Sequence, residues 1–184
     1  MNPGPQWSAE DTDRVLIERW KAGDLRAATE LVRRHADALA RFATSAGERD
    51  EIEELVQDTF IRAFSSLDSF RGDSSLRTWL FTIERRLMLD RRRAEKRERN
   101  VVSLDTGEAA TEYDSLDGIV AQETAKRVRR AVTTLSPMQR EVFIMRVEQG
   151  LAYKEIATVL GTSEGAARVH YHNAIRAVKE FLNE

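Results

Sequence analysis

Side chains that can read DNA bases share one face of a predicted helix near the end of the chain. Four residues form this face: Arg168, Val169, His170 and Asn173. An apolar seam with spacings of four, three and four lies opposite, made of Ala167, Tyr171, Ala174 and Val178. Asparagine can pair bidentately with adenine, and valine can pack on a thymine methyl group. The pattern favours a DNA-reading helix, and an ordinary helical hairpin is the alternative.

A shorter helix and a tight turn must hold that face in place. Upstream, Ile156, Ala157 and Leu160 fall on one side of a helix, and Gly161 supplies the left-handed turn that ends it. Thr162 and Ser163 are N-cap candidates for the next helix. This is the outline of a helix-turn-helix, whose second helix enters the major groove while the first braces against the DNA backbone.

Arginine and aromatic side chains are combined in residues 70–93. A glycine-containing turn leads to Ser74 or Ser75 as N-cap, and the predicted buried stripe of the helix that follows is Leu76, Trp79, Leu80, Ile83 and Leu87. The other faces are expected to expose Arg77, Thr78, Arg85, Arg86, Arg91, Arg92 and Arg93, with Phe70 and Phe81 reachable from the same side. Guanidiniums hold phosphates and rings stack on unpaired bases, so this segment is typical of a groove for single-stranded DNA. The alternative is that the aromatics are core and the arginines are merely solvated.

Residues 51–64 form the most regular amphipathic pattern in the chain. Its core face is Ile52, Leu55, Val56, Thr59, Phe60, Ala63 and Phe64, and its opposite face is Glu51, Glu54, Gln57, Asp58 and Arg62. Acidic residues just upstream add to a local negative charge, which would suit a basic partner surface. A metal site on these carboxylates is not expected, because no histidine lies three residues further on and no second such helix exists.

Composition favours an all-α protein. The chain has 184 residues, 33% of them charged and 7% aromatic, with three prolines and nine glycines. The net charge is −2, so a nucleic-acid role has to come from how charge is distributed. There is no cysteine, which excludes disulfides and thiolate metal sites. The chain begins with no secretory signal and has no long apolar run, so we expect a soluble cytoplasmic protein without membrane insertion.

Charge and periodicity divide the chain into three parts. Residues 10–99 and 123–184 are predicted as two small helical domains, and residues 100–122 as a flexible acidic linker. The linker has no lysine or arginine and carries Asp105, Glu108, Glu112, Asp114 and Asp117. It follows a strongly basic helix end at residues 85–99. A solvated charged stretch without a further role is the alternative for the linker.

The second domain has a clear order of helices. A short amphipathic helix carries Val128, Ala131, Val132 and Leu135. The run Ser136-Pro137-Met138-Gln139 then predicts a capping box with proline at the first helical position. The new helix buries Val142 and Phe143 and ends before Gly150. Residues 123–184 are therefore expected to form four helices.

These motifs together resemble the RNA polymerase sigma factors, in particular the small two-domain extracytoplasmic-function (ECF) group of the sigma-70 family. The resemblance covers nearly the whole chain and rests on ELVQDTFIRAF at 54–64, FRGDSSLRTWLFTIERRLMLDRRR at 70–93 and LSPMQREVFIMRVEQGLAYKEIATVLGTSEGAARV at 135–169. It implies a first domain that binds core RNA polymerase and opens the minus-10 promoter element. It also implies a second domain that reads the minus-35 element.

The resemblance assigns roles to particular residues. Core-polymerase contacts, on the clamp helices of the largest subunit, fall on Glu54, Gln57, Asp58 and Arg62. Minus-10 recognition and strand capture fall on Phe70, Arg71, Asp73, Ser74, Arg77, Thr78, Arg85 and Arg86. Minus-35 recognition falls on Thr162, Ser163, Arg168, Val169, His170 and Asn173. The polymerase flap is a further expected contact, and the linker is expected to thread the catalytic cleft and RNA exit channel.

Three departures from the family pattern are visible. In the reader helix, Arg168, Val169 and His170 stand where the family commonly has lysine, serine and arginine. Asn173 stands where the family has another arginine. We therefore expect an altered minus-35 preference. His170 and His172 are two apart and point in nearly opposite directions, which argues against a metal pair. Glu84 replaces a small residue, and we expect it to pair with a neighbouring arginine.

The sequence therefore predicts a promoter-specificity subunit without catalytic activity, cofactor or metal, and with core RNA polymerase and promoter DNA as partners. An anti-sigma factor is a further expected partner, because many relatives are held inactive in this way. The alternatives are a stand-alone helix-turn-helix repressor and a nucleic-acid hydrolase that uses the carboxylates at 51–58. The arginine and aromatic groove argues against the repressor, and no convergent ligand set supports the hydrolase.

Overall fold

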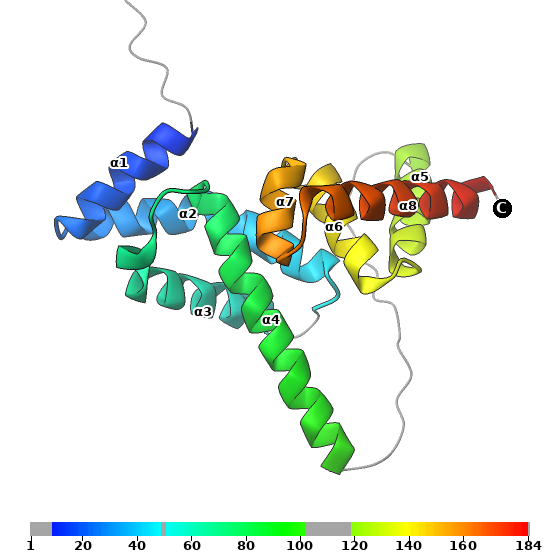
Figure 1. The fold of residues 1–184 in the computed structure, drawn as a ribbon, viewed down its shortest axis with the longest axis horizontal. Coiled ribbons are helices and arrows are strands. Elements are labelled where there is room, and N and C mark those ends of the chain that lie inside the picture. Colours follow the sequence, from blue (N-terminus) through cyan, green and yellow to red (C-terminus); the bar gives the residue numbers. More distant parts are fainter. Residues whose placement is uncertain (1–8, 49–50, 102–118, 184) are drawn as a thin grey trace, which may run out of the picture. The chain divides into compact units, whose positions relative to one another are not determined.

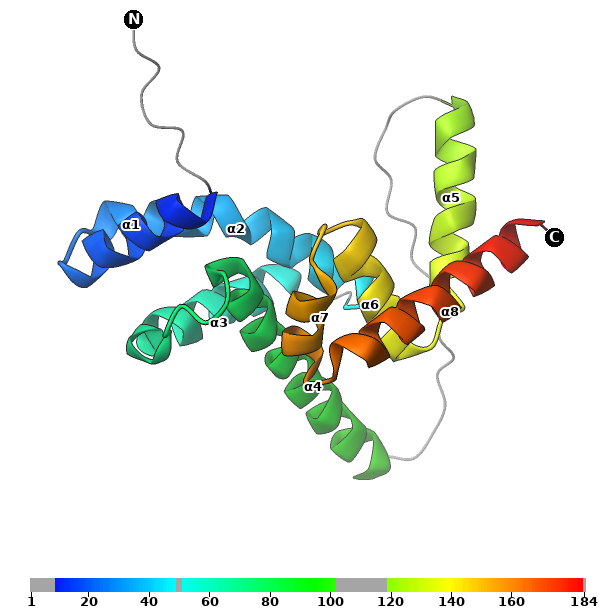
Figure 2. The same cartoon turned by 45° about the horizontal axis from the view of Figure 1, so that its top comes forward.

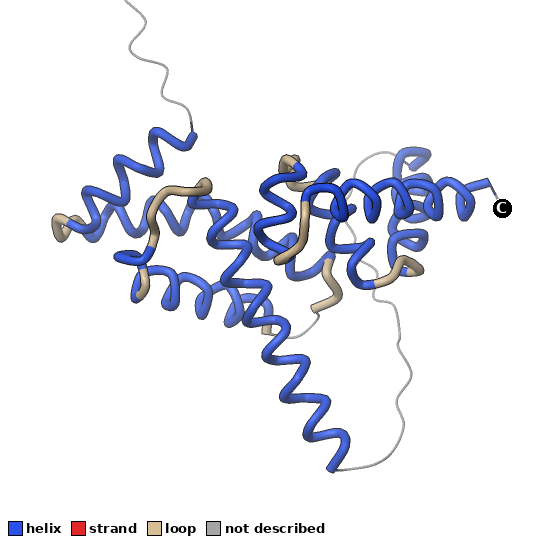
Figure 3. Tube along the Cα trace, in the orientation of Figure 1, coloured by secondary structure: helices blue, strands red, loops and turns tan. Residues whose placement is uncertain are grey.

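The computed structural model describes residues 9–48, 51–101 and 119–183. These ranges form α-helices and one short 3-10 turn, and they contain no strand, which confirms the all-α prediction (Figure 3). Along the chain the elements are α1 (Ala9–Lys21), α2 (Leu25–Ser45), α3 (Ile52–Ser65), η1 (Leu67–Ser69), α4 (Leu76–Val101), α5 (Ile119–Thr133), α6 (Pro137–Val147), α7 (Tyr153–Leu160) and α8 (Glu164–Asn183) (Figure 1).

The helices belong to two compact units. The first consists of residues up to Leu89 together with Thr158–Leu160, and the second holds the remaining residues beyond Leu89, so α4 contributes to both units. The segment predicted as a linker, 100–122, is helical at both ends, because α4 continues to Val101 and α5 already begins at Ile119. Residues 102–118, which include the acidic residues of that segment, lie outside the described residues. The domain limits at 99 and 123 stay predictions.

In the first unit α2 packs against both α1 and α3. Aromatic pairs join helices that are far apart in sequence: Trp20 of α1 stacks on Phe64 of α3, and Phe42 of α2 meets Phe81 of α4 edge to face, each with ring centroids 5.2 Å apart. Such pairs add to the energy of burying the rings. The core of this unit therefore depends on all four of its α-helices.

The turn between α1 and α2 is fixed by Asp24. Gly23 has a φ of 92°, which only glycine adopts easily, and it ends α1. The Asp24 carboxylate then accepts a hydrogen bond from the Arg26 backbone N–H at 3.0 Å and caps α2. Arg19 donates to the same carboxylate at 2.6 Å, and this hydrogen bond is the main reason that the pKa of Asp24 is lowered.

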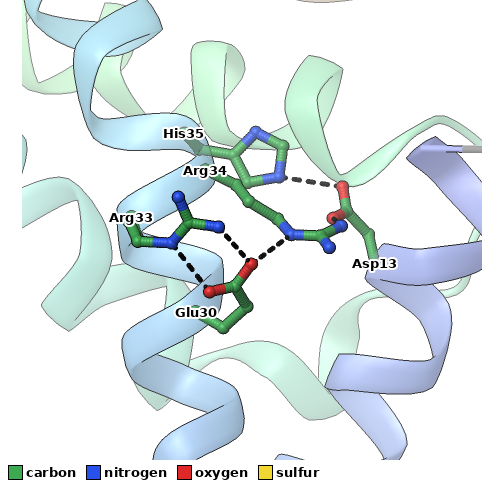
Figure 4. A network of polar contacts seen from close by, with 5 residues as sticks. All are labelled: Asp13, Glu30, Arg33, Arg34 and His35. Carbon is green, nitrogen blue, oxygen red and sulfur yellow. Dashed lines mark hydrogen bonds and ion pairs between the residues drawn. The ribbon is translucent and has the colours of Figure 1, made fainter.

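A polar network also joins α1 to α2 (Figure 4). His35 Nε2 lies 2.8 Å from Asp13 Oδ2, and both side chains are buried. Arg34 extends the network, since it reaches Asp13 at 3.4 Å and Glu30 at 2.9 Å. Arg33 also donates to Glu30, and hydrogen bonds from Arg33 and then Arg34 lower the pKa of Glu30 to about 2. The buried Asp13–His35 pair fixes how α1 lies on α2.

The second unit is organised around α8. Both α5 and α6 pack on this helix, and α5 meets its C-terminal part, where Arg127 donates to the Leu182 carbonyl at 2.9 Å (Figure 2). The core cluster consists of Ala131, Leu135, Phe143, Ala174 and Val178. Val142 and Phe143 are buried as predicted.

The predicted capping box at the start of α6 is confirmed. Ser136 is the N-cap, Pro137 is the first helical residue, and the Ser136 backbone N–H donates to Gln139 Oε1 at 3.2 Å. Arg140, one residue further on, donates to the Val132 and Thr133 carbonyls at the end of α5. These bonds satisfy backbone groups that both helix ends would otherwise leave without partners.

Candidate nucleic-acid interfaces

The exposed face of α3 carries the polar residues predicted for it. Leu55, Val56, Thr59, Phe60 and Ala63 are buried, whereas Ile52 and Phe64 are half-buried. Glu51, Glu54, Gln57 and Arg62 are exposed, and Asp58 is half-buried on the same side. Ile61 lies among them and is 57% exposed. The face is therefore acidic and polar with one aliphatic side chain at its centre.

The turn before α4 presents the next group of predicted residues. Arg71 and Asp73 are exposed, whereas Phe70, Ser74 and Arg77 are half-buried. Phe70 packs on Trp79, with ring centroids 5.1 Å apart. Ser75, rather than Ser74, caps α4, because its Oγ accepts a hydrogen bond from the Thr78 backbone N–H at 3.2 Å. The turn is thus anchored by a ring contact at one end and a helix cap at the other.

Two residues expected on the outer surface of α4 are buried instead. Thr78 and Phe81 are both 0% exposed. The Thr78 hydroxyl lies 2.9 Å from the Ser75 hydroxyl, and Phe81 packs on Phe42 of α2. The prediction of their exposure was wrong because the buried face of α4 is wider than the stripe that its leucines suggested. Arg77 lies over the Phe81 ring, with its Cζ 5.5 Å from the centroid.

The arginines further along α4 differ in exposure. Arg86 and Arg93 are exposed, whereas Arg85, Arg91 and Arg92 are half-buried. Arg93 lies 3.4 Å from Asp90 in a surface ion pair. Surface pairs of this kind contribute little to stability. The arginines from Arg85 to Arg93 give this part of α4 a high density of positive charge.

Glu84 pairs with no arginine of the described residues, so that prediction was wrong. The residue is 0% exposed, and neither carboxyl oxygen has a hydrogen-bond partner among the described residues. Burial, with a smaller effect from the charge of Glu48, raises the pKa of Glu84 to about 9. A carboxyl group in these surroundings is held in its neutral form.

Helices α7 and α8 form the predicted helix-turn-helix. Ile156, Ala157 and Leu160 are buried. Gly161 has a φ of 65°, and the Thr162 N–H donates to the Ala157 carbonyl at 3.0 Å, which closes the end of α7. Ser163 caps α8, because its Oγ accepts from the Ala166 N–H at 3.1 Å. The turn therefore fixes the direction in which α8 leaves α7.

The predicted reading face of α8 points away from its core seam. Ala167, Ala174 and Val178 are buried and Tyr171 is half-buried, as the seam requires. Arg168 and Val169 are exposed, Val169 by 58%, whereas His170 and Asn173 are half-buried. Of the two turn residues, Thr162 is half-buried and Ser163 is exposed. This arrangement leaves the N-terminal turns of α8 open to a ligand.

Sequence reasoning missed one residue beside this face, Tyr153. Its ring lies between two guanidiniums, with Arg146 Cζ at 4.8 Å and Arg168 Cζ at 4.6 Å from the ring centroid. Tyr153 begins α7, and the two arginines come from α6 and α8. No periodicity within one helix signals such a contact, because it forms only when three helices pack together.

Two further properties bear on what this protein can bind. Within residues 9–48, 51–101 and 119–183, no group of three or more His, Asp or Glu side chains is placed to hold a metal ion. No helix in the same ranges is long and apolar enough to cross a membrane.

Two family models match the chain at the segments that carry these surfaces. Sigma-70 region 2 matches residues 31–98, and Sigma-70, region 4 matches residues 125–178. The RNA polymerase sigma factor CnrH of Cupriavidus metallidurans is 33% identical over 172 residues, which cover 89% of this chain and 87% of that protein. The chain belongs to the ECF group of the sigma-70 family. As a sigma factor, it confers promoter specificity on RNA polymerase in transcription initiation, and its family acts as initiation factors rather than as enzymes.

Other sigma factors extend the likeness over nearly the full length. The ECF RNA polymerase sigma-E factor of Escherichia coli is 29% identical over 180 residues, which cover 93% of this chain and 94% of that protein. A solved structure of the sigma factor RpoE in complex with the anti-sigma factor NepR, from Bartonella quintana, matches with a TM-score of 0.67 at 29% identity. That match covers 84% of this chain and 96% of the solved one.

Proposed function

We propose that this sigma factor uses three separate surfaces, one for core polymerase and two for promoter DNA. The observation that carries the proposal is the order of these surfaces along the chain. The exposed acidic face of α3 comes first, the arginine-rich face of α4 follows, and the open N-terminal turns of α8 come last. Each lies within a segment matched by region 2 or region 4.

The α3 face is the proposed docking site for core polymerase. Glu54, Gln57, Asp58 and Arg62 supply hydrogen bonds and charge complementarity, and exposed Ile61 supplies apolar area at the centre. Interfaces commonly combine an apolar centre with a polar rim. Clamp helices with a basic surface on the largest polymerase subunit would fit this pattern, and the flap would receive the second domain.

The turn before α4 and the first turns of α4 are the proposed site of minus-10 strand capture. Arg71, Asp73, Ser74 and Arg77 are at least partly accessible and can contact an unstacked base or its phosphate. Phe70 is anchored on Trp79 and offers its free side as a stacking surface. Thr78 acts indirectly in this scheme, by holding Ser75, and Arg85 and Arg86 continue the phosphate path.

The N-terminal turns of α8 are the proposed reader of the minus-35 duplex. Arg168, Val169, His170 and Asn173 face the bases, while Thr162 and Ser163 lie where the backbone would pass. We propose in addition that a cognate anti-sigma factor regulates this protein in the cytoplasm, since the related RpoE was solved with such a partner. The linker predicted at residues 100–122 is proposed to thread the polymerase cleft and the RNA exit channel.

Reconstituted transcription tests the proposal directly. Purified core polymerase is mixed with the protein and a fragmented genomic DNA library, and the 5′ ends of the RNA are sequenced. Discrete start sites that appear only with the protein, and that share upstream elements, are expected. Inert polymerase together with binding of duplex DNA by the protein alone would support the stand-alone repressor instead.

A charge reversal on α3 separates polymerase binding from DNA binding. Glu54→Lys places a positive charge on the docking face, and we expect the affinity for core polymerase to fall at least roughly tenfold because like charges would meet. Asp37→Lys is the matched control, since Asp37 is exposed on α2. Titration of labelled protein with core polymerase measures both. Equal affinities for the two variants would contradict the assignment of this face.

A further inference from the structure

The Arg168 side chain is held on two sides. The Tyr153 ring supports one side, with the guanidinium carbon 4.6 Å from its centroid. Glu164 holds another, with Arg168 Nη2 2.5 Å from its Oε1. Glu164 lies one turn before Arg168, toward which long helical side chains point. The guanidinium is therefore fixed over the first turn of α8.

Tyr153 is itself held in place. Arg146 covers the ring with its Cζ 4.8 Å from the centroid, and its Nη1 donates to the Leu151 carbonyl at 2.8 Å. Tyr171 meets the ring edge to face at 5.9 Å. The tyrosine is thus packed between α6 and α8 and cannot easily follow a moving arginine. It is a rigid support.

Both contacts favour recognition of a base over recognition of a phosphate. A phosphate contact depends on net positive charge, and Glu164 beside Arg168 cancels that charge locally and repels phosphate. Two parallel bonds to a base edge depend instead on a fixed guanidinium plane, which the stacked ring provides. Guanine offers two acceptors in the major groove, O6 and N7, whereas adenine places an N–H donor at the corresponding position.

We propose that Arg168 reads a guanine in the minus-35 element, and that Tyr153 and Glu164 are the residues that position it. The inference rests on the proposed function, in which α8 enters the minus-35 major groove. The tyrosine and the glutamate touch no base in this scheme. They act through Arg168, because a guanidinium that is already oriented loses less conformational freedom on binding.

Transcription by reconstituted holoenzyme from a promoter library with a randomised minus-35 element tests this inference. With the unmodified protein, one position is expected to prefer guanine roughly tenfold. Arg168→Ala abolishes that preference, whereas Tyr153→Leu and Glu164→Gln weaken it severalfold. All three variants keep the base preferences at the other positions of the element. Tyr153→Phe keeps the ring and retains the preference.

Matched controls lie further along the same helix. Arg176→Ala and Glu180→Gln change exposed residues of α8 away from the cluster and leave the guanine preference intact. Thermal unfolding of every variant checks that α8 is still packed. Uniform weakening of all promoter sequences by Arg168→Ala would overturn the inference and make Arg168 a phosphate contact. An unchanged preference in Tyr153→Leu would overturn the positioning role.

The same experiment distinguishes a failure of the proposed function from a failure of the guanine assignment. If the unmodified protein supports no promoter-specific transcription, the proposed function fails before any variant is compared. If transcription is specific but no position depends on Arg168, only the guanine assignment fails.

Discussion

Buried polar side chains in the described residues differ in how their polar atoms are satisfied. The Thr59 hydroxyl donates to the Leu55 carbonyl at 2.8 Å, and buried Asp13 meets His35. Glu84 is also buried, yet its oxygens have no hydrogen-bond partner among the described residues. An ionised carboxylate there would carry a large desolvation cost, so the neutral acid is the form compatible with the fold.

Glu84 is expected to make folding stability depend on pH. Its pKa is raised from an ordinary value of 4.5 to about 9, so between these values the folded state keeps a proton that the unfolded state releases. The folded state then binds more protons, and the free energy of unfolding falls as pH rises through this window. Glu84→Gln removes the titrating group, so the free energy of unfolding should change less with pH in this window.

Urea unfolding across this pH window measures the effect of Glu84. Glu53→Gln, an exposed change on α3, is the control and should keep the slope of the unmodified protein. An identical pH dependence in the protein with and without Glu84→Gln would show that the carboxyl group is not held neutral.

At the scale of the element, α1 lies outside the matched region 2, which begins at residue 31. Two contacts attach it to the other helices: Trp20 stacks on Phe64 of α3, and Asp13 meets His35 of α2. Leu16 and Ile17 add buried apolar area on the same helix. Apolar contacts therefore attach α1 to the first unit, and the Asp13–His35 pair sets its position on α2.

Removal of Asp13 is expected to loosen α1. Asp13→Ala leaves buried His35 without this partner, and we expect a loss of about 2 kcal/mol in the free energy of unfolding. Glu18→Ala is the control on α1, because Glu18 is exposed and forms a surface pair with Lys21 at 3.9 Å. Chemical denaturation compares the two, and amide hydrogen exchange localises the loss. Equal stability of both variants would mean that apolar contacts alone attach α1.

At the scale of the whole molecule, a net charge of −2 provides no general attraction to DNA. Positive charge is concentrated on α4, while α3 presents carboxylates. If α4 binds promoter DNA as proposed, we expect the attraction to come from this local patch rather than from the overall field of the protein. Weak binding of the free protein to DNA of arbitrary sequence is therefore compatible with tight promoter binding in the holoenzyme.

Salt dependence measures the contribution of that local patch. Arg86→Gln removes one exposed charge of α4, and the slope of the logarithm of promoter affinity against the logarithm of salt concentration should fall by about 1. Arg26→Gln changes an exposed arginine of α2 and should leave the slope unchanged. Holoenzyme binding to a promoter fragment at several salt concentrations provides both values. A slope that Arg86→Gln does not alter would exclude this arginine from the phosphate path.

Local patterns in the sequence predicted the core faces of α3 and α8 and the order of the helices in residues 123–184. The seam of α8, the core face of α3, the capping box at Ser136 and the cap at Ser163 each depend on residues within a few positions of one another. Hydrogen bonds and side-chain spacing within one helix determine such features, so they follow from the order of the residues. The candidate surfaces on α3 and α8 were predictable for the same reason.

Tertiary structure alone decided which side of α4 is enclosed and what surrounds Arg168. The leucines of α4 predicted a narrow stripe, but Phe81, Glu84 and Met88 lie on the next face and are buried as well. Tyr153 meets Arg168 only because α6, α7 and α8 converge. The geometry of a single helix determines which residues share a face. Which of those faces becomes buried depends on how several helices pack together.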